Sequence, residues 1–232
     1  MAAKLTDIFN AADQASRSLA ARLDQILEAL PEKIAELKAQ HPDKDILLVQ
    51  VPIDNKYDKN KSPEERSGDV AAAMARVGRV AAAFEKELVE RFPQINCNMS
   101  SSNSVWGDFL SLTIVTSEES LVARLHRAGI SPQNPQEAFE GMQRIMPKRA
   151  LAEYFSLHQS IEMVHHAALQ MRVNGGDPET MGPVTFEGMG MPNPAKYHGR
   201  YAFWDVDGTW PKPALLPEFK HIFDKKNKPP QP

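Results

Sequence analysis

Cysteine is nearly absent from this chain of 232 residues, in which Cys97 is the single example. One cysteine cannot form a disulfide within the chain or supply the several thiolates of a cysteine-rich zinc site. The sequence also lacks an apolar run of about 18 residues, the length that a membrane-spanning helix needs. Its first residues contain no continuous apolar segment typical of a secretory signal. These absences predict a soluble cytoplasmic protein that does not enter a membrane.

A strong excess of charge of either sign is also missing, because the formal net charge is −3. Such a chain has no global attraction to nucleic acid or to an anionic membrane, and we expect neither as a partner. The sequence contains no phosphate-binding loop, no dinucleotide-binding glycine motif and no nucleophile elbow. Its 42% of hydrophobic and 25% of charged residues are typical of a globular protein with a packed core.

The pattern of apolar residues predicts a helix-rich α+β fold. Apolar side chains at steps of three and four predict a helix over residues 5–30, and Pro31 is placed to begin a second helix. The seam of the first helix would suit a dimerising coiled coil, but it would equally suit packing on its own chain. A run of branched residues at 45–53 then predicts a buried strand.

The middle of the chain continues this alternation of helices and strands. Residues 62–65 (Ser-Pro-Glu-Glu) have the spacing of a helix N-terminus with a capping box, and the helix is expected to reach Phe92. Two strands are expected at 94–99 and 108–115, joined by a serine-rich turn at 100–104. The order of strand, helix, strand and strand is compatible with a ferredoxin-like, split βαβ arrangement of about three strands.

Three more helices are expected before the composition changes. The first begins at Ser117 and ends before Gly129, which occupies the position of a helix C-terminal glycine. The second begins at Asn134 and Pro135, and Pro147 opens a long third helix. These boundaries divide the chain into a helical arm (1–40) suited to oligomerisation, an α+β core (45–174) and an irregular tail (175–232).

The tail combines residues that break secondary structure with residues that need burial. It holds 10 of the 18 prolines and 7 of the 12 glycines, but also 8 of the 17 aromatic residues. So much aromatic surface is unfavourable in water, which argues against a disordered segment. We therefore expect the tail to pack on the core or on a partner.

The long helix from 151 to 173 carries the densest group of possible metal ligands or proton carriers: His158, Glu162, His165 and His166. At about 100° per residue, these four side chains fall in one sector beside the main apolar stripe. A histidine in that half-buried position needs a hydrogen-bonding partner. A structural network of histidine–glutamate hydrogen bonds is one interpretation of this strip.

The other interpretation is a metal site. Since a helix rises about 1.5 Å per residue, His158 and His165 are roughly 10 Å apart along the axis and cannot both bind one ion. Further ligands would have to come from the tail, where His198 and Asp205 are available. One ion could therefore take Glu162 with either His158 or His165, and the candidate ligands for zinc, iron or manganese are His158, Glu162, His165 and His198.

The segment 205–209 (Asp-Val-Asp-Gly-Thr) resembles the first motif of the haloacid dehalogenase phosphatases. In that family the first aspartate attacks a phosphoryl group and the motif follows the first strand of a large doubly wound sheet. Here only 23 residues follow Thr209, which leaves no room for the later motifs. The segment is better interpreted as a strand over 201–206 followed by a tight turn at Asp207 and Gly208.

Two hypotheses of function follow. The first is a non-enzymatic protein-binding or assembly protein without a cofactor, which we expect to be a homo-oligomer. Abundant amphipathic surface and the lack of a complete catalytic motif favour it. The second is a metal-dependent enzyme, such as a hydrolase, which uses the His/Glu cluster of the helix 151–173 with a ligand from the tail.

Overall fold

The computed structural model describes residues 4–10, 13–54, 60–104, 107–131, 133–173, 197 and 199–208. As predicted, the fold is α+β. Its mixed sheet contains β1 (Ile46–Ile53), β2 (Asn96–Ser104), β3 (Gly107–Val115) and β4 (Tyr201–Phe203). The helices are α1 (Gln14–Gln40), α2 (Pro63–Arg91), α3 (Leu121–Arg127), α4 (Pro135–Ile145) and α5 (Lys148–Val173). Within the described ranges, no helix has both the length and the apolar character needed to cross a membrane.

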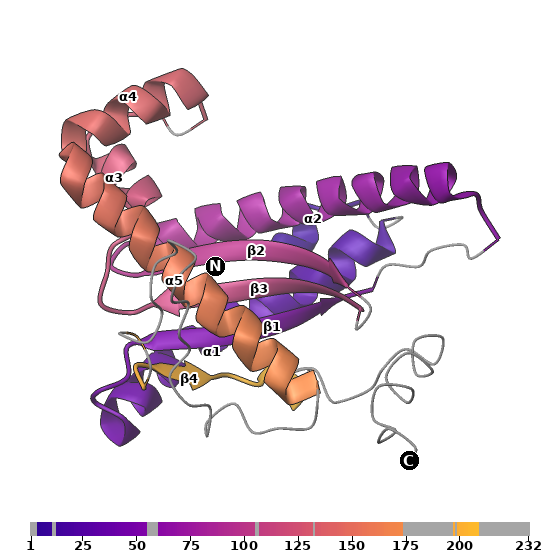
Figure 1. Ribbon diagram of the computed structural model, residues 1–232, viewed down its shortest axis with the longest axis horizontal. Coiled ribbons are helices and arrows are strands. Elements are labelled where there is room, and N and C mark those ends of the chain that lie inside the picture. The colour runs from indigo at the N-terminus through magenta and orange to yellow at the C-terminus, as the bar shows by residue number, and fades with distance from the viewer. Residues whose placement is uncertain are drawn as a thin grey trace, which may run out of the picture.

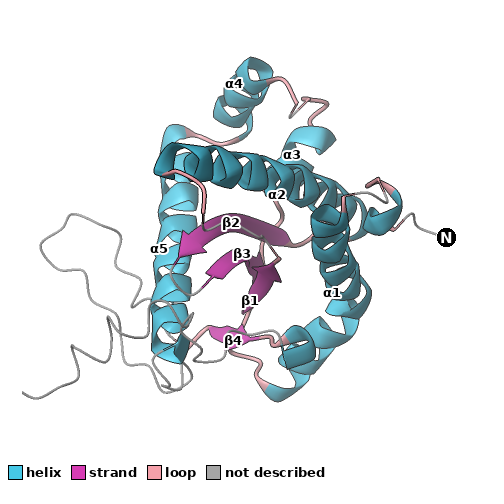
Figure 2. Cartoon of the chain, turned by 90° about the vertical axis from the view of Figure 1, so that its right-hand side faces the viewer, coloured by secondary structure: helices cyan, strands magenta, loops and turns pink. Residues whose placement is uncertain are grey.

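The sheet is covered by helices on both faces. Figure 2 shows α1 and α5 on opposite sides of the sheet, with α2 above β2. In Figure 1, α3 and α4 stand outside these layers, at the end of the molecule where α5 begins. The long helix α5 therefore connects the sheet to a pair of helices that lie apart from it.

The strands have the order β2-β3-β1-β4. Because β1 and β2 both run antiparallel to β3, which lies between them, β1, α2 and β2 form a βαβ unit split by a third strand. The wider ferredoxin-like arrangement stays a prediction. The sequence indicated about three strands in the sheet. The strand predicted over 201–206 is the shorter β4, which joins the sheet as a fourth strand and runs parallel to β1.

A charged pair joins β4 to the beginning of β1. The Arg200 guanidinium donates hydrogen bonds to both carboxylate oxygens of Asp45, with an Nε–Oδ1 distance of 3.0 Å. Burial opposes ionisation of Asp45, but hydrogen bonds from Arg200 and Ser117 outweigh it and hold the pKa of this carboxyl below its usual value. The backbone N–H groups of Asp45 and Ile46 donate to the Arg200 carbonyl, each at 3.0 Å. Hydrogen bonds of both the side chains and the backbone therefore hold the beginning of β4 against the beginning of β1.

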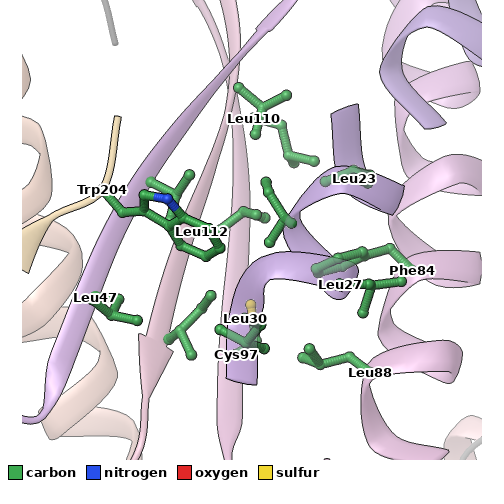
Figure 3. Packing of buried hydrophobic residues seen from close by; sticks show 14 of the residues in the cluster. Leu23, Leu27, Leu30, Leu47, Phe84, Leu88, Cys97, Leu110, Leu112 and Trp204 are labelled. Carbon is green, nitrogen blue, oxygen red and sulfur yellow. The ribbon is translucent and has the colours of Figure 1, made fainter. Parts of the chain in front are cut away.

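The larger hydrophobic core lies between the sheet and the pair α1 and α2 (Figure 3). Phe84 of α2 is completely buried in it, and Trp204, which follows β4, belongs to the same cluster with 8% of its surface exposed. Cys97 also lies in this core, and burial raises the pKa of its thiol.

The prediction of two N-terminal helices meeting at Pro31 is wrong. One helix, α1, begins at Gln14 and continues through Pro31. A proline inside a helix loses one hydrogen bond and strains the preceding turn. The helix continues because Leu30 on one side of the proline and Leu37 on the other are buried in the same core, so that packing outweighs the local cost.

The first predicted turns, near Leu5, form a separate 3-10 helix (Leu5–Asp7). The buried Asp24 carboxylate of α1 accepts hydrogen bonds from the backbone N–H groups of Leu5 and Thr6, at 2.9 and 3.2 Å. This turn brings Leu5 back into the core. The apolar seam of α1 packs in the same core, where its residues Leu19, Leu23, Ile26 and Leu30 are buried. Of the two interpretations of this seam, a dimerising coiled coil and packing on its own chain, the structure shows the second.

Predictions based on local capping signals are confirmed, whereas two boundaries are wrong. Ser62 and Glu65 form the capping box of α2, and Gly129 follows α3 with a φ of 72°. However, α3 begins at Leu121 with Ser120 as its N-cap, four residues after the predicted start. The serines at 100–104 were predicted as a turn, but β2 extends through them to Ser104. Residues 100–104 all pair with β3, and Ser100 also donates a hydrogen bond to Glu162 of α5.

Candidate functional site

The face of the sheet that meets α5 carries polar side chains near its centre. They come from three adjacent strands: Gln50 of β1, Ser111 and Thr113 of β3, and Asn96, Asn98 and Ser100 of β2. The strand register places Gln50, Ser111 and Ser100 in one row across the sheet. Because side chains alternate along a strand, these residues point away from the core on the other face. The histidine-bearing helix therefore packs on a polar surface.

His165 lies in the middle of this interface, with 1% of its surface exposed. Its Nε2 atom is 2.8 Å from Nε2 of Gln50, and its Nδ1 atom is 3.2 Å from Oγ1 of Thr113. Since the Gln50 amide nitrogen can only donate, His165 Nε2 accepts, and the ring proton lies on Nδ1 and is donated to Thr113. Burial, assisted by the nearby charge of His166, lowers the pKa of His165 to about 3, so the ring is neutral at neutral pH.

The Gln50 side chain shares its amide hydrogens between two partners. Besides His165, Nε2 donates to Oγ of Ser111 at 2.7 Å. The Gln50 carbonyl oxygen is buried and has no hydrogen-bond partner within the described residues. A buried polar atom of this kind is costly. The two hydrogen bonds that Nε2 donates, to His165 and to Ser111, determine the orientation of the Gln50 amide.

Glu162, one turn before His165, collects hydrogen bonds from two strands. Its carboxylate accepts from Nδ2 of Asn98 at 3.1 Å, from Oγ of Ser100 at 2.8 Å and from Oγ1 of Thr113 at 3.4 Å. Thr113 thus accepts from His165 and donates to Glu162. The result is a continuous chain of hydrogen bonds that begins at Gln50 and ends at a carboxylate whose side chain is 17% exposed.

His158 belongs to a second cluster, near the start of β2. Nδ2 of Asn96 lies 2.9 Å from both His158 Nε2 and the Tyr154 hydroxyl, and Glu118 Oε2 is 3.5 Å from the same histidine nitrogen. Burial raises the pKa of Tyr154 and keeps its hydroxyl protonated. Nδ1 of His158 is buried without a hydrogen-bond partner in the described part of the chain.

The predicted metal ligands therefore lie in different places. His158 contacts Asn96 and Glu118, while Glu162 and His165 contact the centre of the sheet; His198 lies outside the described residues. Among the residues that the structure describes, no group of three or more histidine, cysteine or acidic side chains could hold an ion. The metal site stays a prediction. The exposed member of the strip is His166, whose Nε2 is 3.9 Å from Oε2 of Glu162.

In this arrangement the His/Glu strip fastens α5 to the sheet. Both ring nitrogens of His165 are hydrogen-bonded, so it could meet a substrate or a metal only after these bonds break. Between His158 and His165, the apolar residues Ile161 and Val164 of α5 pack with Ile46 and Leu48 of β1 in a smaller apolar cluster. The helix is held by polar contacts at its centre and by apolar contacts beside them. The predicted network exists, but its partners are mainly amides and hydroxyls of the sheet.

These partners were missed in the sequence. Ser111 and Thr113 alternate with apolar residues, a pattern typical of a strand with one face in solvent, yet both side chains are buried under α5. Two signals pointed to them. Gln50 interrupts an otherwise apolar strand, and Asn96, Asn98 and Ser100 recur at every second position of β2, as side chains on one face of a strand do. Neither signal identifies the helix that covers them.

A cleft of about 310 Å³ lies away from the strip, between α3 and α4. Its lining includes Arg124, Arg127 and Ile145, together with Glu119, which makes ion pairs with both arginines. None of these residues belongs to the His/Glu strip. The internal ion pairs already neutralise much of the charge in this cleft.

Among the residues that the structure describes, the most exposed aromatic side chains lie on α4 and on the first part of α5. Phe139 of α4 is 56% exposed and Phe155 of α5 is 52% exposed, although most large apolar side chains in the described ranges are buried. The third strongly exposed apolar residue is Ile8, at 57%, in the N-terminal segment. Phe139 and Phe155 thus leave apolar surface accessible to solvent on two helices that follow each other in the chain.

No known protein family matches the chain, and neither does any curated protein or solved structure. Its function therefore has to be argued from its own residues.

Proposed function

We propose that the protein is a non-enzymatic protein-binding or assembly protein. Its contact surface is formed by α4 and residues 148–155 of α5, which we call the α4–α5 shoulder. The observation that carries this proposal is the exposure of Phe139 and Phe155, each more than half accessible to solvent. Aromatic side chains are enriched in protein interfaces, where they supply much of the binding free energy.

The position of the shoulder supports the same function. Helices α3 and α4 stand clear of the layers around the sheet, so a partner could reach them without disturbing the core (Figures 1 and 2). The buried side of α4 is narrow, because Gly141 is its one residue that is fully buried. The remainder of its apolar stripe, including Met142 and Ile145, is only partly covered.

The His/Glu strip, by contrast, favours a structural role. His165 and Glu162 are engaged with four side chains of the sheet, which leaves them little freedom to bind a substrate; the four are Gln50, Asn98, Ser100 and Thr113. A catalytic group has to reach the atom on which it acts. The strip therefore supports the binding hypothesis indirectly, since it supplies a rigid base for the shoulder.

Photo-crosslinking tests the proposal. Incorporating p-benzoylphenylalanine in place of Phe139 or Phe155, in cells that express the protein naturally, should give discrete adducts with a protein partner after irradiation. A second substitution, Phe139→Asp, should suppress the adducts formed from position 155 if both residues belong to one surface. The measurement is the yield of adducts on denaturing gels.

The matched control is the same photoreactive residue at Lys86 on α2, whose side chain is 73% exposed. Exposure alone predicts equal yields at all three positions. Adducts at positions 139 and 155 that are no more abundant than those at 86 would contradict a binding surface at the shoulder.

The second candidate is a metal-dependent enzyme, and one observation favours it. Glu162 and the half-exposed His166 lie one helical turn apart with 3.9 Å between Oε2 and Nε2, a separation that allows both to bind one ion. Other ligands would have to come from residues that the structure does not describe, such as His198. Zinc, iron and manganese all accept this combination of nitrogen and oxygen ligands.

Elemental analysis of untagged protein distinguishes this candidate. A metal enzyme would contain about one equivalent of metal per chain, and Glu162→Gln and His166→Ala would each remove it. We expect less than about a tenth of an equivalent in the wild-type protein. His41→Ala is the control for loss of an exposed histidine. Stoichiometric metal that His41→Ala retains, and that the other two variants lose, would establish the metal site that the enzyme hypothesis requires.

A further inference from the structure

The two faces of the sheet are covered in different ways. On one face, α1 and α2 bury a continuous apolar core that contains Ile26, Phe84 and Leu88. On the other face, α5 lies across polar side chains of three strands and contributes Ile161 and Val164 to the buried residues of the smaller apolar cluster. Burial of apolar surface is the main favourable term when one element packs on another. We therefore expect α5 to be held on the sheet less strongly than α1 and α2.

The hydrogen bonds at the centre of α5 add little to this attachment. Glu162 accepts from Oγ of Ser100 at 2.8 Å. His165 donates to Oγ1 of Thr113 at 3.2 Å. When α5 separates from the sheet, each of these groups forms equivalent hydrogen bonds with water, so the net contribution of such a bond is small. The polar contacts fix the position of α5 more than they increase the free energy of its docking.

Two buried polar atoms at the same interface favour separation. Among the residues that the structure describes, two buried side-chain atoms have no hydrogen-bond partner, Oε1 of Gln50 and Nδ1 of His158. Gln50 lies under the centre of α5, and His158 belongs to α5 itself. A buried polar atom without a partner is unfavourable because it has lost its hydrogen bonds to water. Both atoms regain water when α5 leaves the sheet, whereas the apolar core on the other face has no such gain.

The start of α5 is attached to helices that keep their own contact. A Cβ atom on Gly141 of α4 would lie 2.7 Å from Cγ2 of Ile130 and 3.1 Å from Cδ2 of Leu125, so α4 packs tightly on α3 and on the residues that follow it. Both helices stand outside the layers around the sheet (Figure 1). Separation of α5 from the sheet therefore does not have to break the contact between α3 and α4.

We propose that α5 is a lid, and that the protein has a minor open state in which α5 leaves the sheet while α1, α2 and the three long strands stay folded. The inference goes beyond the proposed function and needs no partner at the α4–α5 shoulder. In the closed state both ring nitrogens of His165 are occupied. In the open state His165 and Glu162 reach water together with the polar side chains of the sheet. Opening of the lid is thus the step that controls access to the His/Glu strip.

Hydrogen–deuterium exchange of the full chain at neutral pH, followed by mass spectrometry, tests the inference. A helix separated from its support is only marginally stable in water, so the amides of α5 exchange when the lid opens. Peptides from residues 155–169 should exchange at least about tenfold more slowly than an unfolded chain and about tenfold faster than peptides from residues 77–88 of α2. Low concentrations of urea should accelerate α2 more steeply, since complete unfolding exposes more surface than the opening of one helix. Amides of α5 that are as slow and as sensitive to urea as those of α2 would overturn the inference.

One mild substitution in each interface separates lid opening from complete unfolding. Ile26→Val, in the core under α1, should accelerate exchange of α2 by about fivefold. It should leave exchange of α5 unchanged, because the core under α1 stays intact when the lid opens. Thr113→Val removes the hydroxyl that contacts both Glu162 and His165, and it should accelerate exchange of α5 and of α2 by about fivefold or more, since both openings break these contacts.

The two variants give opposite results if α5 has no opening of its own. In that case Ile26→Val would accelerate α5 as much as α2, because both helices would exchange only from the unfolded chain. That result would overturn the inference, as would a Thr113→Val protein in which exchange of α5 is unchanged. Far-UV circular dichroism checks that both variants keep their fold.

Discussion

Substituting Trp204 with alanine should lower the free energy of unfolding by about 3 to 5 kcal/mol, the range for removing a large aromatic side chain from a packed core. Trp204 is 8% exposed and lies in the core cluster near Leu47 and Leu112 (Figure 3). Its backbone N–H also donates to the carbonyl of Leu48 at 3.0 Å. The substitution should therefore leave a cavity under the sheet, at the point where β4 ends. Urea denaturation followed by circular dichroism gives the value.

Two control substitutions separate packing from other effects. Trp204→Phe keeps most of the buried area and should cost less than half as much as Trp204→Ala. Ile8→Ala changes an exposed apolar residue and should alter the free energy of unfolding by less than about 0.5 kcal/mol. If Trp204→Ala were as mild as Ile8→Ala, the tryptophan would not be part of the core.

Acidification should destabilise the protein through His165. The pKa of this histidine is about 3 in the folded chain and about 6.5 in an unfolded one. Above pH 6.5 the ring is neutral in both states, and its contribution to stability is fully present. As the pH falls below 6.5, only the unfolded state takes up the proton, so the free energy of unfolding decreases by about 1.4 kcal/mol per pH unit until the pH approaches 3.

Replacing this histidine isolates its contribution. His165→Gln retains an amide that can accept from Gln50 and donate to Thr113, but it does not titrate. Between pH 6 and 4, the free energy of unfolding should fall with decreasing pH less steeply for His165→Gln than for the wild type. The two slopes should differ by about 1.4 kcal/mol per pH unit. Urea denaturation at several pH values measures both slopes, with His41→Gln as the control for an exposed histidine. Equal slopes for wild type and His165→Gln would show that the histidine is not held neutral in the fold.

The elements that the sequence predicted well are those determined by neighbouring residues. The capping box of Ser62 and Glu65, the turn glycine Gly129 and the start of α4 at Pro135 depend on contacts within a few positions. The sector of α5 that contains His158 and His165 was also placed correctly beside the core, since the spacing within one helix determines it.

The features that were missed depend on distant residues. Pro31 remains inside a helix because the side chains on both sides of it meet a core that the rest of the chain builds. The serines after Asn98 form a strand because Ser100 finds its acceptor in Glu162, 62 positions later. No local pattern shows that two such segments will meet, so the sequence could indicate the polar strip of α5 but not the polar surface on which it lies.

The pairing of β4 with β1 has a consequence for the order in which the protein folds. Asp45 and Arg200 are 155 positions apart, so their pairing closes a very long loop at a large entropic cost and is expected late in folding. Until that step, the outer edge of β1 is open and the place of Trp204 in the core is empty. An exposed strand edge next to an apolar gap is a template for pairing with another chain. The interval before β4 docks is therefore the time at which the newly made protein is most prone to aggregate.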